Sequence, residues 1–208
     1  MKTSDINLPP IIGVSGVARS GKDTFVAVAN AILKKARSDN KGVMRAAFAD
    51  KVKEDLHQLL VKKVGISAFT SYDHEKKVIR PLLVAYGMMM RGIDEDYWVN
   101  RLDMSFKLAQ STGLPMFIPD VRFANEVDYV HKNGGLVVHL SQKGLKPANE
   151  TEEKHDPIVK EMSDIQLEWE NVEGAKELPQ DKLEKLLIKE LSPVVRSTLK
   201  NLHIDAAA

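Results

Sequence analysis

The sequence predicts an α/β protein in which a parallel sheet forms the middle of three layers and helices cover both faces. Short apolar runs typical of buried strands alternate along the chain with longer stretches of helical periodicity. The first run, 11–14, leads through a glycine-containing loop into an amphipathic stretch. Hydrophobic residues make up 43% and charged residues 28% of the chain, as in ordinary globular proteins. We expect residues 1–208 to form a single domain.

The expected elements follow from hydrophobic spacing and from turn residues. Strands are expected at 11–14, 43–48, 116–118, 136–140 and 165–169. Helices are expected at 21–33, 50–64, 79–91, 94–111, 124–132 and 183–191, with Asp50 capping the second. The polar segment 65–78 and the charged segment 141–163 are interpreted as loops. Residues 51–112 therefore form a helical insertion between two strands of the sheet.

The composition excludes several classes of protein. Lys and Arg number 30 and Asp and Glu 29, so a net charge of +1 gives no general attraction to nucleic acids or membranes. The chain has no cysteine, which excludes disulfides, thiolate zinc sites and thiol catalysis. The longest uncharged run, 6–18, contains two prolines and is shorter than the roughly 18 residues that span a membrane. We expect a cytoplasmic protein that binds neither nucleic acid nor membranes.

The strongest local signal is the segment Gly16-Val17-Ala18-Arg19-Ser20-Gly21-Lys22. Its G-x-x-x-x-G-K spacing lies between a predicted strand and a predicted helix, the context that a phosphate-binding loop requires. Glycines let the backbone turn its N–H groups toward phosphate oxygens, and the helix N-terminus attracts negative charge. We expect Lys22 to reach the β- and γ-phosphates of a nucleoside triphosphate. The predicted ATP-binding residues are Gly16, Ala18, Arg19, Ser20, Gly21, Lys22, Asp23 and Thr24.

Position 23 departs from the usual motif, in which a Ser or Thr after the Lys binds Mg²⁺. Here Asp23 takes that position, and Thr24 follows one residue later. Asp23 is expected to ligate magnesium, directly or through water, or to act on the hydroxyl of an acceptor. The predicted metal ligands are Asp23, Thr24 and Asp120. The six histidines show no spacing that predicts a structural metal site.

Arginines and carboxylates further along the chain predict a second, phosphate-bearing substrate. The Asn-Lys-x-Asp motif of GTPases is missing, which favours a small-molecule kinase whose arginines neutralise the transferring phosphates. Asp120 follows an apolar strand and is interpreted either as a magnesium-organising acid or as a helix cap. Glu126 lies four residues after Arg122, so it can orient that guanidinium. Further candidates, with a surface role as the alternative for each, are Arg80, Arg91 and Arg101.

Two other features have both a structural and a functional interpretation. Trp98 either packs between helices or offers a flat surface on which a nucleobase stacks. The acidic stretch 150–156 is interpreted as a solvated surface.

The chain resembles the phage-type deoxynucleoside monophosphate kinases, a branch of the P-loop nucleoside monophosphate kinases. The matching segments keep the family order over roughly residues 11–140. They are Ser15-Gly16, Gly21-Lys22-Asp23-Thr24, Phe48-Ala49-Asp50 with Lys53, Arg80-Pro81-Leu82-Leu83 with Gly87 and Arg91, Asp96-Tyr97-Trp98-Val99 and Asp120-Val121-Arg122-Phe123-Ala124-Asn125-Glu126. The chain departs from the family at Val84 and Met88, where Gln and Thr are common, and at Ala124, where Pro is common.

The resemblance implies transfer of the γ-phosphoryl group of ATP to a deoxynucleoside 5′-monophosphate, with Mg²⁺, by an enzyme that forms a homodimer. It implies that the insertion at 51–112 binds the acceptor and acts as a lid. It also implies a location in the cytoplasm of the host if a phage encodes the protein. The implied catalytic residues are Lys22, Asp23, Asp120, Arg122 and Glu126. The implied substrate-binding residues are Asp50, Lys53, Arg80, Arg91, Trp98, Arg122 and Glu126.

Two other functions fit the same phosphate loop. A kinase of another small phosphorylated acceptor, such as phosphomevalonate, can share the Gly-Lys-Asp sequence. A nucleotide-dependent binding ATPase also has such a loop, but the chain lacks the basic stripe, the repeats and the separate partner domain that would favour one.

Overall fold

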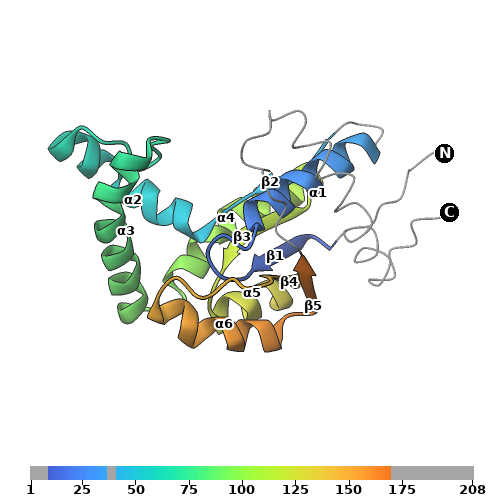
Figure 1. Cartoon of the computed structure of the whole chain (residues 1–208). Helices are drawn as coiled ribbons and strands as arrows, with labels where there is room; N and C mark the ends of the chain where they lie inside the picture. The colour runs from blue at the N-terminus through green and yellow to red at the C-terminus, as the bar shows by residue number, and fades with distance from the viewer. Residues whose placement is uncertain (1–8, 37–40, 170–208) are drawn as a thin grey trace.

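The structure is a computed structural model of the chain, and it describes residues 9–36 and 41–169 (Figure 1). Five strands in the described residues form a sheet of order β2-β3-β1-β4-β5, and every neighbouring pair is parallel. The strands are β1 Ile11–Ser15, β2 Met44–Arg45, β3 Met116–Val121, β4 Leu136–Gln142 and β5 Ile165–Trp169. The predicted α/β fold with a parallel sheet is confirmed.

Alternating side chains along the central strands create a core on each face of the sheet. In β1, Ile11 joins one buried cluster, while Ile12 and Val14 join the other. In β4, Val137 lies with Ile11 and Val138 lies with Ile12. Because both faces are covered, these strands are apolar on both sides, which is why they appear as continuous apolar runs in the sequence.

Helices cover both faces of the sheet and extend to one side of it. Phe25 and Leu33 of α1 (Lys22–Ala36) pack on the face of Ile12, whereas α4 (Tyr97–Thr112) and α5 (Ala124–Lys132) bury Leu102, Phe106 and Val130 on the other. Between β2 and β3 the chain also forms α2 (Phe48–Val64) and α3 (Asp73–Ile93). Figure 1 shows α3 and the end of α2 lying away from the sheet. The helices α2, α3 and α4 thus lie between β2 and β3 in the chain, where the sequence predicts a helical insertion at 51–112, and α4 also covers a face of the sheet.

The structure corrects several predicted boundaries. The strand expected at 43–48 contains only Met44 and Arg45, because Phe48 already begins α2. Asp50 lies inside that helix and does not cap it; the N-cap residue is Ala47. The loop expected at 65–78 ends at Asp73, where α3 begins, and this helix continues through Pro81.

The largest correction concerns segment 141–163, where a loop was expected. Its second half is the helix α6, Glu150–Met162. The side chain of Asn149 accepts a hydrogen bond from the N–H of Glu152, and acidic residues occupy the first turn, where the helix dipole favours them. The helix predicted at 183–191 lies outside the described residues. Within the described ranges, no helix has both the length and the apolar character needed to cross a membrane.

Candidate active site

The loop between β1 and α1 is a tightly turned backbone that only particular residues allow. Gly16 has φ +126°, and a Cβ there would lie 2.1 Å from the carbonyl oxygen of Leu140, so a side chain is excluded. Gly21 has φ +89°, and Arg19 is the non-glycine residue with a positive φ in the described part of the chain, at +70°. Ser20 donates its backbone N–H to the carbonyl of Val17 at 3.2 Å, which closes the turn.

Lys22 lies over this loop and is 9% exposed. Its Nζ donates to the carbonyl oxygens of Gly16 and Val17, at 2.7 Å each. Burial and then the charge of Arg122 lower the pKa of Lys22, whereas the charges of Glu152, Asp23 and Asp120 act in the opposite direction. The charges of Asp23, Asp120 and Arg122 therefore all act on Lys22.

A chain of ion pairs connects the loop to α2. Arg45, at the end of β2, pairs with Asp23 at 3.3 Å and with Asp50 at 2.8 Å. Asp50 also pairs with Lys53 at 2.8 Å. These groups are half-buried to exposed, so the chain of charges is open to solvent beside the phosphate loop. Asp50 and Lys53, which the sequence predicts to bind substrate, are thus connected through Arg45 to Asp23 beside the loop.

Asp120 joins β3 to the N-terminus of α2. Its two carboxylate oxygens accept hydrogen bonds from the N–H groups of Phe48 at 3.0 Å and Ala49 at 2.8 Å. Ala47, the N-cap residue, has no side chain that can make such bonds. Burial raises the pKa of Asp120, and the two N–H groups partly offset that rise. Asp120 is therefore a helix cap, which is one of its two interpretations from the sequence. The helix that it caps is α2, which is distant from it in the sequence.

We expect Asp120→Asn to lower the free energy of unfolding by about 1–2 kcal/mol, because an amide offers one acceptor where the carboxylate offers two. Urea unfolding of the variant and the wild type measures the loss. Asp128→Asn, a change at an exposed position of α5, is the control and should leave the stability unchanged. Equal stability of all three proteins would contradict the capping role of Asp120.

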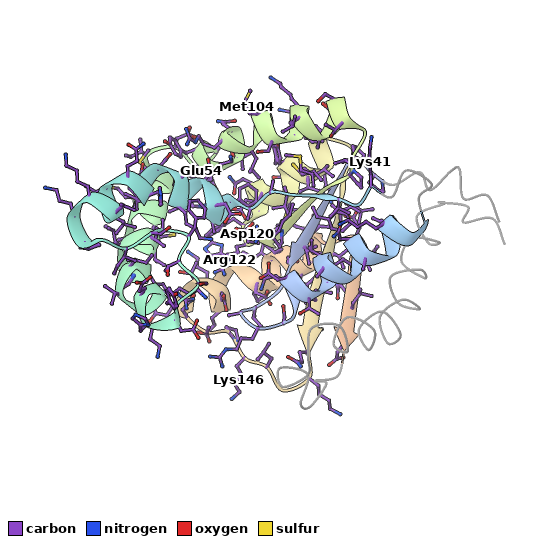
Figure 2. All side chains as sticks on the ribbon, turned by 90° about the horizontal axis from the view of Figure 1, so that it is seen from above. Lys41, Glu54, Met104, Asp120, Arg122 and Lys146 are labelled. Atoms are coloured by element: carbon purple, nitrogen blue, oxygen red, sulfur yellow. The ribbon has the colours of Figure 1, made fainter. Side chains whose placement is uncertain are left out.

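Arg122 is held at both ends by carboxylates from different helices. Its backbone N–H donates to Oε2 of Glu126 at 2.7 Å. Its guanidinium Nη1 lies 3.3 Å from Oε1 of Glu152 on α6. The prediction that Glu126 orients the Arg122 guanidinium is therefore corrected: Glu126 fixes the backbone, and Glu152 contacts the guanidinium. Figure 2 shows Asp120 and Arg122 together near the middle of the molecule.

Glu126 is a buried acid, 3% exposed, that also accepts from the N–H of Phe123 at 3.2 Å. Its Oε1 lies 3.6 Å from Nη1 of Arg91. Burial raises the pKa of Glu126 to about 8. The N–H groups of Arg122 and Phe123 and the charge of Arg91 act in the opposite direction but do not offset the effect of burial. The buried Glu126 therefore holds a proton to a higher pH than an ordinary glutamate does.

This raised pKa predicts a pH-dependent stability. Between 4.5, the ordinary value, and about 8, the folded protein retains a proton that the unfolded chain releases. The stabilisation is therefore complete below pH 4.5 and is lost as the pH rises toward about 8, by up to about 1.4 kcal/mol per pH unit. Glu126→Gln removes this dependence, while Glu153→Gln at an exposed position retains it. Urea unfolding at several pH values from 5 to 8.5 gives the free energy of unfolding of both variants and the wild type. If this free energy fell with pH as steeply for Glu126→Gln as for the wild type, the assignment would be wrong.

The arginines of the insertion are placed differently from one another. Arg91 is packed, since it stacks over the ring of Phe123 at 3.7 Å, bonds to Asn125 and joins α3 to the segment after β3. Arg101 pairs with Asp55 at 2.5 Å and joins α4 to α2. Arg80 is exposed on α3. The contacts of Arg91 and Arg101 thus connect neighbouring elements of the fold, which is a structural role.

Trp98 lies in the core and is 4% exposed. Its Nε1 donates to the carbonyl of Gly87 at 2.9 Å, and its ring contacts Tyr97 and Tyr86 edge to face. This placement corresponds to the helix-packing interpretation and leaves no indole face open to a base. The stacking interpretation is corrected accordingly.

Two residues of the site were missed by the sequence analysis. Arg45 is the second residue of a strand of only two residues, which is too short to be recognised in the sequence. Glu152 was placed in a solvated acidic stretch, but it is 7% exposed and accepts a hydrogen bond from the N–H of Ala18 in the phosphate loop at 3.1 Å. The spacing of Asn149 and Glu152, a capping residue and an acid three positions later, is a helix-start signal that predicts α6.

The predicted metal ligands differ in how well they fit Mg²⁺. Among the described residues, no group of three or more His, Asp or Glu side chains forms a metal site. Magnesium in phosphoryl transfer is held by substrate phosphates with one or two carboxylates, so a single exposed acid is sufficient. Asp23, with its side chain 82% exposed beside the loop, fits this role. Asp120 fits less well, because two N–H groups already occupy its oxygens.

Comparison with known proteins yields structural similarities only. No protein-family model and no curated protein matches the chain. Dephospho-CoA kinase from Campylobacter jejuni is similar in structure, with a TM-score of 0.46, 11% identity and coverage of 91% of this chain and 98% of that one. A sugar kinase from Janibacter sp. has a TM-score of 0.38, 12% identity and coverage of 88% and 93%. At these TM-scores, the assignment of the site rests on its own geometry.

Proposed function

We propose that the protein is a kinase that transfers the γ-phosphoryl group of ATP to a deoxynucleoside 5′-monophosphate. The observation that carries this proposal is the loop from Gly16 to Lys22, which connects a buried parallel strand to a helix and carries a buried lysine. Helix N-termini and glycine-rich turns of this kind bind phosphate groups. The order of the sequence motifs, rather than any contact, supports a deoxynucleoside monophosphate as the acceptor.

In this proposal, cationic groups bind the phosphates of both substrates. Lys22 exchanges the carbonyls of Gly16 and Val17 for the β- and γ-phosphates of ATP. Arg122 binds the transferring group, and Arg45 and Lys53 lie on the side of α2, where an acceptor phosphate would bind. An oxygen of the acceptor phosphate attacks the γ-phosphorus, the bond from that phosphorus to the β–γ bridging oxygen breaks, and ADP leaves.

Mg²⁺ would be held by Asp23 and Thr24 together with the phosphates of ATP. When bound, the ion neutralises charge on the β- and γ-phosphates. Asp23 is paired with Arg45 at 3.3 Å in this structure, so Arg45 is the residue that would give up a partner when the metal binds.

A panel of acceptors tests the proposal. Purified protein is incubated with ATP and Mg²⁺ and with each common deoxyribonucleoside or ribonucleoside monophosphate, or with phosphomevalonate, and ADP release is measured. We expect release that requires a deoxynucleoside monophosphate, together with formation of the corresponding diphosphate. Equal release without any acceptor would favour the binding ATPase, and release with phosphomevalonate alone would favour the other kinase.

A further inference from the structure

Glu152 is a buried carboxylate to which the proposed reaction assigns no role. Its Oε2 accepts hydrogen bonds from the N–H groups of Ala18 at 3.1 Å and Ala148 at 3.0 Å. Its Oε1 lies 3.3 Å from Nη1 of Arg122. One side chain of α6 therefore connects the phosphate loop to the residue that follows β3, although these segments lie far apart in the sequence.

We propose that Glu152 is a positioning residue that ties the guanidinium of Arg122 to the backbone of the phosphate loop and so fixes it beside the transferring phosphoryl group. This inference rests on the proposed function. Arg122 follows β3 and has a side chain that is 41% exposed, and an arginine in such a place samples many rotamers unless a partner restrains it. Glu126 fixes its backbone N–H, and Glu152 fixes its other end.

An alternative role for Glu152 would be to block the phosphate site. The hydrogen bonds of the loop distinguish the positioning role from this alternative. Glu152 uses the N–H of Ala18, whereas the backbone N–H groups of Arg19, Gly21 and Lys22 have no partner among the described residues. Those three N–H groups are among the donors that remain for phosphate oxygens. Glu152 and a nucleotide therefore do not need the same donor, and both can be bound at once.

The charge of Glu152 is maintained by its surroundings. Burial alone raises the pKa of this carboxyl, but the N–H groups of Ala148 and Ala18 and the charges of Arg122 and Lys22 outweigh it, so the pKa lies below its ordinary value. A carboxylate that stays ionised keeps a charge-assisted hydrogen bond to a guanidinium over the physiological pH range.

The test is a double-mutant cycle between Glu152 and Arg122, with turnover measured on the acceptor that the wild type prefers. Glu152→Gln keeps the shape but loses the charge, and we expect it to lower turnover about tenfold. In the Arg122→Ala background, the same change should alter turnover by less than about twofold, because Glu152 then has nothing to position. Glu153→Gln, one residue away and exposed, is the matched control and should behave like the wild type.

Two results would overturn the inference. A tenfold further loss in the Arg122→Ala background means that Glu152 acts independently of Arg122. Turnover of Glu152→Gln equal to or above that of the wild type means that the carboxylate is dispensable or blocks the site. If Glu152→Gln does not fold, Glu152→Asp, which keeps the charge but is too short to contact all three partners, should show a smaller loss with the same dependence on Arg122.

A measurement without acceptor separates this inference from the proposed function. In the wild type, ADP should slow amide exchange at 16–22 and also at 119–126, because Glu152 connects the two segments. In Glu152→Gln the slowing should be confined to 16–22. Retained slowing at 119–126 would contradict the inference, even if the wild type phosphorylated every monophosphate tested. A wild type that binds ADP with this pattern and phosphorylates none would contradict only the proposed acceptor.

Discussion

Lys22→Ala should lower turnover by a factor on the order of 10²–10³ while the protein remains folded. The ammonium of Lys22 is buried over the loop between β1 and α1 and donates to the carbonyls of Gly16 and Val17, and in the proposed reaction it binds the β- and γ-phosphates instead. Its positive charge offsets the negative charge that shifts onto the bridging oxygen as ADP leaves. An alanine supplies neither the charge nor the donor.

Circular dichroism and steady-state kinetics with ATP varied check this prediction. The far-ultraviolet spectrum should be unchanged, because Lys22 lies at the first position of α1 and alanine is compatible with a helix. Lys107→Ala removes an exposed lysine of α4 and serves as the control for a general effect of lost charge. If Lys22→Ala and Lys107→Ala both turned over like the wild type, the assignment of the phosphate loop would be wrong.

The sheet and the tight loop between β1 and α1 could be predicted because their signals are local in the sequence. The strand β1 is buried on both faces, so Ile11, Ile12 and Val14 are all apolar and appear as a run. The loop follows it directly, with glycines at the two positions where φ is +126° and +89°. Burial on both faces requires neighbouring apolar residues, and a positive φ favours glycine. Both requirements can therefore be recognised in a single sequence.

The helix α6 could not be recognised by periodicity because its buried side is narrow. Only Glu152 and Val159 are buried in it, and one of these is an acid. A proline at position 157 and the many charges also favour a loop on propensity grounds. The tertiary contacts of Glu152 outweigh that propensity, and they involve Ala18, which is 134 residues away.

The partners of the site carboxylates were the least predictable feature. Sequence spacing places Glu126 near Arg122, and it does contact that residue, but through the backbone N–H. Asp120 lies at the expected sheet edge, yet its oxygens bond to amides of α2 at positions 48 and 49. Spacing fixes which residues of one element share a face, whereas the fold determines which atoms from another element reach them.

The second large effect is expected at Arg122. Arg122→Ala should lower turnover by a factor on the order of 10², because it removes a charge-assisted hydrogen-bond donor beside the transferring phosphoryl group. Arg122→Lys should lower it about tenfold, although the charge remains, because an ammonium cannot donate two parallel hydrogen bonds in one plane. It also cannot contact Glu152 and a phosphate oxygen with the fixed geometry of a guanidinium.

Steady-state kinetics with the monophosphate varied at saturating ATP distinguishes this role from that of a surface ion pair. An exposed pair contributes at most about 1 kcal/mol to stability and nothing to the rate. Arg101→Lys is the control, since Arg101 also pairs with a carboxylate, Asp55, but joins α4 to α2 away from the loop. Turnover should fall for Arg122→Lys and stay unchanged for Arg101→Lys. Wild-type kinetics for Arg122→Lys would mean that its pair with the buried Glu152 has a structural role only, and that Arg122 does not contribute to the rate.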